Sequence, residues 1–188
     1  MCASHRYIRD EPLWYFGHGE SYATFSYSTF KVHSLKSGVC DTVDVSVTVT
    51  RIAKPQGKAD HLPADEIVQL YVATEPTDPS GVAPLARLRL CDFTRLHDLT
   101  VGESREVRFK VTPSDVAVVN PVGRVGWELR AGAVRFWIGG RQPTIDEVAT
   151  GPRSGQVNGL QTATVSIDGS TTPLANCTSA SNASTRAV

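Results

Sequence analysis

Apolar and polar residues alternate most regularly at positions 42–50, where four valines occupy every second position. A period of two places one face of a strand on a core and the other face in solvent, so this run predicts a half-buried antiparallel strand. Residues 66–73 are apolar on both faces and predict a central strand. The side chains of this second run are Val68, Leu70 and Val72 on one face, and Ile67, Gln69 and Tyr71 on the other.

Shorter alternating runs at 105–111, 127–130, 134–138 and 163–167 predict further strands, with glycines and prolines between them. The phase of the aromatic positions switches near Ser28-Thr29, which predicts a bulge there. Thr112 followed by Pro113 predicts the start of one short helical turn. No long helical period occurs, so the pattern predicts an all-β sandwich. Its expected core residues are Val45, Val47, Val68, Leu70, Val107, Phe109, Phe136 and Ile138.

Composition narrows the class of protein. A chain of 188 residues with 40% hydrophobic residues suffices for one packed domain plus extensions, but is too short for a complete eightfold barrel. The formal net charge is zero, which gives no indication of a nucleic-acid partner. Apolar runs are too short to cross a membrane, and residues 1–10 are charged where a signal peptide would be apolar. We therefore expect no nucleic acid, no membrane and no signal peptide for this chain.

The cysteines do not define a site. Cys2, Cys40, Cys91 and Cys177 lack metal-ligand spacing, and their sequence positions leave every disulfide pairing open. Residues 169–188 form a tail rich in Ser, Thr, Ala and Asn, and from position 176 onward we expect disorder. The tail contains two N-glycosylation sequons, at Asn176 and Asn182, which favour a secreted protein.

No catalytic, cofactor or metal motif is present in the sequence. The histidines are too dispersed in the sequence to converge, and Asp44, Glu106 and Glu128 fall on strand faces expected to be solvated. We therefore expect no catalytic residues, no cofactor and no metal in this chain.

The aromatic residues suggest a contact surface. Trp14-Tyr15-Phe16 precede Gly17-His18-Gly19, and Tyr22 follows. Such a cluster suits a loop packed against the sandwich or a neighbouring domain, and it can also stack on a sugar. Trp137 is out of phase with its core-facing neighbours, so we expect it on the outer face, exposed or covered by the following chain. Trp137 and Trp14 are the sequence's candidates for an exposed carbohydrate platform.

Several sequence motifs follow one another over residues 4–168. The longest occupies residues 11–25, and the others are Ser4-His5-Arg6-Tyr7, Asp65-Glu66-Ile67-Val68-Gln69-Leu70-Tyr71-Val72, Phe93-Thr94-Arg95-Leu96-His97, Gly102-Glu103-Ser104, Pro113-Ser114-Asp115-Val116 and Gly139-Gly140. As a set they resemble family 3 glycoside hydrolases, whose signature E-P-L-x-x-F-G-x-G-L-S-Y-T-x-F is similar to residues 11–25 except at Glu20 and Ala23. The run from Arg95 to Leu99 looks more like the β-xylosidase branch than the β-glucosidase branch.

The resemblance implies an immunoglobulin/fibronectin type III-like sandwich, the C-terminal domain of such an enzyme, at residues 23–168. Residues 1–22 would then be the end of a missing α/β domain and a linker, and 169–188 a low-complexity tail. In the family the catalytic Asp and Glu lie in the preceding barrel and α/β domains. Those domains would be this chain's partners, and β-linked oligosaccharide would be reached only through them.

We therefore expect a non-catalytic module of a secreted β-xylosidase- or β-glucosidase-like hydrolase of plant cell-wall polysaccharide, inactive alone, whose parent enzyme is extracellular. The 14–22 loop would shape the rim of the parent's active-site cleft. The alternative is a stand-alone carbohydrate-binding or immunoglobulin-like interaction module.

Overall fold

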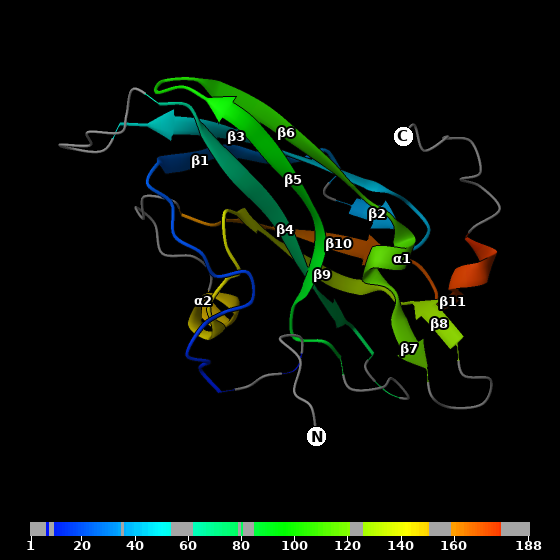
Figure 1. The fold of residues 1–188 in the computed structure, drawn as a ribbon. Coiled ribbons are helices and arrows are strands. Elements are labelled where there is room, and N and C mark those ends of the chain that lie inside the picture. Colours follow the sequence, from blue (N-terminus) through cyan, green and yellow to red (C-terminus); the bar gives the residue numbers. More distant parts are fainter. Residues whose placement is uncertain are drawn as a thin grey trace.

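The computed structural model describes residues 7, 10–34, 36–53, 62–78, 80, 85–120, 126–150 and 159–177. Its strands and short helices follow one another as drawn in Figure 1. In chain order they are β1 (Thr24–Val32), β2 (Lys36–Gly38), β3 (Val43–Ile52), β4 (Ala64–Pro76), β5 (Arg89–Leu99), β6 (Ser104–Val111), α1 (Pro113–Val116), β7 (Val118–Asn120), β8 (Gly126–Leu129), β9 (Gly132–Gly139), α2 (Ile145–Thr150), β10 (Gln161–Asp168), β11 (Thr172–Pro173) and the 3₁₀ turn η1 (Leu174–Asn176).

One layer of the sandwich is the antiparallel sheet β1-β3-β6. The expected bulge lies in β1, where the register with β3 shifts between Ser28 and Lys31 and Thr29 has a φ of 53°. The shift turns Phe25 and Tyr27 into the core, while Phe30 and Val32 pack against the same core with partial exposure. The predicted bulge is therefore confirmed, and it lets both halves of the strand contribute to one interior.

The other layer has the order β2-β10-β9-β4-β5, with β4 at an interior position. All its pairings are antiparallel except β2 with β10. The inner faces of the two layers meet in a continuous cluster that contains all eight predicted core residues. The all-β sandwich is therefore confirmed, and so is the central position of the 66–73 strand.

The outer face of β4 and β9 carries a second apolar cluster: Tyr71, Ala73, Leu88, Trp137 and Leu160. Trp137 lies on this outer face, as its phase predicts, and it is fully buried because Leu88, Leu160 and Val148 of α2 cover it. Trp137 therefore cannot belong to an exposed carbohydrate platform. Of the two tryptophans predicted for such a platform, Trp14 alone is exposed.

A third small sheet, β11-β8-β7, packs at the end of the sandwich near α1. Glu128 in β8 is buried, contrary to the solvated position expected for it, and it accepts hydrogen bonds from Arg130 Nε at 2.5 Å and Asn120 Nδ2 at 3.0 Å. Thr112 begins α1 as predicted, with its backbone N–H bonded to the Asp115 carboxylate at 2.8 Å.

A disulfide joins Cys40 to Cys177, 137 residues apart. Cys177 is buried with Leu129 and Ala117, so the chain up to this residue packs on the third sheet. Residues 172–177 thus form β11, η1 and a covalent link within the predicted low-complexity tail. The disorder expected from position 176 onward is wrong for Asn176 and Cys177, because η1 and the disulfide hold them. Residues 178–188 lie outside the described residues.

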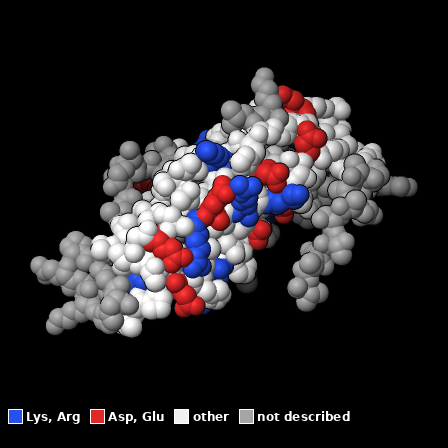
Figure 2. Space-filling view, turned by 90° about the horizontal axis from the view of Figure 1, so that it is seen from above, with Lys and Arg blue, Asp and Glu red and all other residues white. Residues whose placement is uncertain are grey.

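A band of mixed charges crosses the face seen from above in Figure 2. The described ion pairs of β5, β6 and their flanks include Arg95 with Asp65 and Arg108 with Glu106, and the partly exposed pair of Arg105 with Glu103. Because opposite charges neutralise one another side by side, this face has the character of a solvated surface.

Candidate functional site

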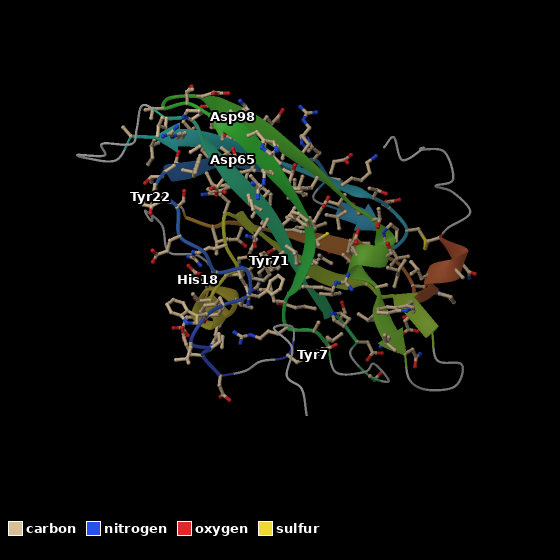
Figure 3. All side chains as sticks on the ribbon, in the orientation of Figure 1. Tyr7, His18, Tyr22, Asp65, Tyr71 and Asp98 are labelled. Carbon is tan, nitrogen blue, oxygen red and sulfur yellow. A yellow bond between two sulfur atoms is a disulfide. The ribbon has the colours of Figure 1, made fainter. Side chains whose placement is uncertain are left out.

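The segment before β1 runs along the side of the molecule that carries α2 (Figure 1). Three of its side chains, Leu13, Trp14 and Phe16, are largely exposed, and Trp14 keeps 71% of its surface accessible. We call these three side chains the aromatic face. His18, labelled on the same side in Figure 3, stacks on Trp14 with ring centroids 4.5 Å apart. Large apolar side chains exposed together are typical of contacts with a partner.

Tyr15 fastens this segment to the sandwich. Its hydroxyl accepts a hydrogen bond from the backbone N–H of Ile145 at 3.1 Å and donates one to Glu11 at 3.0 Å. A tyrosine hydroxyl is protonated at neutral pH, and burial raises the pKa of Tyr15 further. The His18 N–H bonds the Tyr15 carbonyl at 3.0 Å and closes a turn, and Gly17 within it has a φ of +69°. Glycine adopts this left-handed conformation without strain.

The loop that receives Tyr15 is itself rigidly held. Arg141 donates two hydrogen bonds to the Glu147 carboxylate, at 2.7 and 2.8 Å. Thr144 and Glu147 cap the first turn of α2 reciprocally, side chain to backbone N–H. Burial favours the neutral form of Glu147, but the bonds from Arg141 and Thr144 outweigh it and hold the pKa below its usual value.

A pocket of about 200 Å³ lies between the N-terminal segment and this loop. Its wall is mostly apolar. Arg87 in this wall donates a hydrogen bond to the Ile145 carbonyl at 2.7 Å. The Gln142 side chain is buried beside it, and its Oε1 has no hydrogen-bond partner among the described residues. The lining consists of Pro12, Trp14, Tyr15, Phe16, Arg87, Leu88, Gln142, Pro143, Thr144, Ile145 and Val148.

Polar side chains near Gly140 form hydrogen bonds with one another and with its backbone. Gln69 donates to the Gly140 carbonyl at 3.3 Å and accepts from Tyr71 at 2.7 Å. Tyr27 donates to Glu66 Oε1, and burial raises the pKa of both groups. A Cβ at Gly140 would clash with Glu66 Oε1, so a larger residue here would force the Glu66 side chain to shift.

Some of the sequence-predicted site residues therefore converge on one place and others do not. Trp14, Tyr15 and Phe16 line the pocket, and Gly17 and His18 shape the turn beside it. Gly19 has open space around it, and Tyr22 lies at a different pocket, beside Arg51. Asn176 is exposed at the end of η1, and Asn182 lies outside the described residues.

The second half of the site was not foreseen from the sequence. Arg87, Gln142 and Ile145 are far from residues 11–22 in the chain, and their own segments carry no motif. The exposed Trp127 of β8, beside Tyr7, was likewise not predicted. Only the Gly139-Gly140 pair pointed to this region.

Ionisable side chains beside the pocket take part in hydrogen bonds with neighbouring residues. Among the described residues, no three side chains of His, Cys, Asp or Glu are grouped to hold a metal ion. No helix in the described part of the chain has the length and apolar character needed to cross a membrane. Two carboxylates adjoin the pocket: Glu11 accepts a hydrogen bond from the Tyr15 hydroxyl, and Glu147 is paired with Arg141.

Comparisons with known proteins find relatives of this chain. Residues 66–142 match the model of the fibronectin type III-like domain. The chain is 31% identical over 128 residues to beta-glucosidase BoGH3A of Bacteroides ovatus, covering 68% of this chain and 15% of that protein. It is 34% identical over 116 residues to a beta-xylosidase of Formosa agariphila, covering 62% of this chain and 14% of that one.

Solved structures agree. The GH3 beta-glucosidase of Bifidobacterium adolescentis superposes with a TM-score of 0.58 at 27% identity, over 81% of this chain and 18% of that one. The chain thus spans less than a fifth of the relatives it matches. Residues 66–142 are a fibronectin type III-like domain, and the chain is identified as a counterpart of the fibronectin type III-like domain of family 3 glycoside hydrolases.

Proposed function

We propose that this chain is a non-catalytic module of a larger, secreted family 3 glycoside hydrolase that acts on β-linked xylosides or glucosides of plant cell walls. Its role is to dock the aromatic face and the pocket behind it against a neighbouring domain of the same enzyme. The observation that carries the proposal is the rigid, mostly apolar pocket of about 200 Å³ flanked by Leu13, Trp14 and Phe16.

Two further observations support it. The relatives are β-glucosidases and β-xylosidases several times longer than this chain, so the matching region is one part of each. The Cys40–Cys177 disulfide is typical of proteins that fold in an oxidising compartment, which supports an extracellular parent enzyme. A stand-alone carbohydrate-binding module is less well supported, because one of its two candidate tryptophans is buried.

Two measurements test the proposal. The purified chain should hydrolyse neither aryl-β-xylosides nor aryl-β-glucosides above background. Turnover that survives repurification, and that disappears when a carboxylate of this chain is mutated, would overturn the non-catalytic role. Sequencing the DNA upstream of Met1 should reveal in-frame barrel and α/β domains.

In that longer protein, replacing Trp14 and Phe16 with serine should lower the unfolding temperature of the catalytic domains. Trp127→Ser is the matched control, because Trp127 is also about half exposed but lies on β8, away from the aromatic face. Equal effects of the two changes would show that the aromatic face is not the docking site.

A further inference from the structure

A second pocket, of about 240 Å³, lies at the opposite end of β1 from its bulge and has a buried arginine in its wall. Arg51, near the end of β3, keeps 2% of its surface accessible. Its Nη1 donates to the Leu99 carbonyl at 2.7 Å and to the Leu62 carbonyl. Both hydrogen bonds of the guanidinium within the described chain come from this one nitrogen, and the buried Nε has no partner there.

Arg51 has no anionic partner among the described residues. Its neighbour Asp65 lines the same pocket, but the Asp65 carboxylate is occupied on the other side. Oδ1 accepts from the Asp98 N–H at 3.0 Å, and Oδ2 lies 3.2 Å from Arg95 and 3.1 Å from His97. A buried cation without a counter-ion is costly, and carbonyl oxygens compensate only part of that cost.

The pocket is open to a ligand. Tyr22, 92% exposed, stands at its rim, and Figure 3 shows Tyr22, Asp65 and Asp98 at the same end of the sandwich. The remaining wall is small or apolar: Ser21, Ala23, Leu62, Pro63 and Ala64. An anion that enters therefore meets one guanidinium in a poorly hydrated setting, where a charge-assisted hydrogen bond is strongest.

We infer that the Arg51 pocket binds a carboxylate group. A planar monoanion matches one guanidinium, whose fork geometry fits carboxylate oxygens. A doubly charged phosphate would need a second cation, and the described wall instead contains Asp65. This site is separate from the aromatic face and does not depend on the proposed docking function.

The test uses the full chain with ¹⁵N-labelled arginine side chains. Acetate is titrated at constant ionic strength against chloride, and the Arg51 Nε–H resonance is followed. We expect a saturable shift for acetate and none for neutral acetamide. Arg51→Met lacks this resonance, so acetate binding is read there, and in the wild type for comparison, from the backbone amides of Ala23 and Ala64 in the pocket wall on uniformly ¹⁵N-labelled protein. In this variant the dissociation constant of acetate should rise about tenfold or more, because a charge-assisted bond is lost. Arg108→Met, an exposed arginine paired with Glu106, is the matched control and should leave acetate binding unchanged.

A capped aspartate, N-acetyl-aspartyl amide, distinguishes the source of the carboxylate. A shift with both acetate and the capped residue assigns the pocket to a carboxylate side chain of a partner, and a shift with acetate alone assigns it to a small free acid. The wild-type resonance decides the question even if Arg51→Met unfolds. A response to chloride equal to that to acetate, or no saturable shift, would overturn the inference.

Discussion

The hydroxyl of Tyr15 accepts a hydrogen bond from the backbone N–H of Ile145, 130 positions away in the chain. This contact joins the N-terminal segment to the first residue of α2, and both residues line the pocket between them. Tyr15 thus anchors the segment to the module, whereas the aromatic face on the same segment stays exposed.

Tyr15→Phe should weaken the contact between the N-terminal segment and α2 without unfolding the sandwich. The phenylalanine keeps the packing but leaves the Ile145 N–H unpaired, which costs about 0.5–1.5 kcal/mol. Hydrogen exchange should become faster at residues 142–148 and stay unchanged in β3 and β6. Tyr22→Phe is the control, since Tyr22 is exposed and lies outside this pocket. Faster exchange across the whole domain would contradict this view.

Deleting residues 1–20 should leave the sandwich folded and improve its solubility. The main core cluster begins at Ala23 and takes no residue from the deleted segment, whereas Leu13, Trp14 and Phe16 are removed from the surface. Sedimentation should show less self-association, and circular dichroism should still show a cooperative transition. Loss of that transition would mean that the segment belongs to the domain's own core.

Leu70→Ala should destabilise the domain by about 2–5 kcal/mol, because Leu70 is fully buried between the sheets. Thr48→Ala, half-buried on the other face of β3, should cost far less in urea unfolding. Ser46→Ala is not a neutral control, since Ser46 is 1% exposed and its hydroxyl lies 3.2 Å from His33 Nε2. Equal costs for Leu70 and Thr48 would contradict the assigned faces.

Glu66→Gln should stabilise the domain at neutral pH, and the gain should disappear in acid. Burial raises the folded-state pKa of Glu66 above its usual value, and the bond from Tyr27 only partly opposes this. Below the unfolded pKa both states hold the proton, and as pH rises through the folded pKa the carboxylate's contribution to stability falls. Glutamine keeps an acceptor for Tyr27 without ionising. Urea titrations at both pH values measure the difference, and destabilisation at neutral pH would contradict the prediction.

Replacing Cys40 and Cys177 together with serine should lower the free energy of unfolding by about 2–5 kcal/mol, as loss of a native disulfide does in small domains. The thermal midpoint of the wild type should fall similarly in reductant, and that of the double variant should not respond. Cys91→Ser is the control, because Cys91 is a free thiol.

Burial raises the pKa of Cys91 to about 12, so alkylation of this thiol at neutral pH should be slow.

Alternation along the chain predicted the sandwich core because a strand has only two faces, and one inserted residue near Thr29 was visible as a change of phase. Alternation cannot show what covers an outer face. Trp137 and Ser46 are both buried on the side that their phase assigns to the outside, under Leu160 and beside His33 respectively. Glu128 is buried for a related reason. Its partner Arg130 is local, but Asn120 comes within reach only once β7 and β8 pair.

The candidate site was half visible in the sequence. The cluster of Trp14, Tyr15 and Phe16 is local, so its composition shows it. Its other half, around Gln142 and Ile145, comes from a contact between distant segments, which depends on the order of strands in the sheet. The same holds for Cys40 with Cys177, whose pairing follows from where the residues after β2 and after η1 come together. It also holds for Arg51, which has no carboxylate partner within the described part of the chain.

The covalent link between Cys40 and Cys177 also decides how the domain responds to tension. A pull applied to the two ends of the chain passes through the sulfur bridge, so the strands from β3 to β10 carry none of that load. The bridge withholds 137 residues of contour, roughly 450–490 Å at 3.3–3.6 Å for each extended residue. Reduction would make that length available, so the part of the domain between the two cysteines would resist extension only while the disulfide is intact.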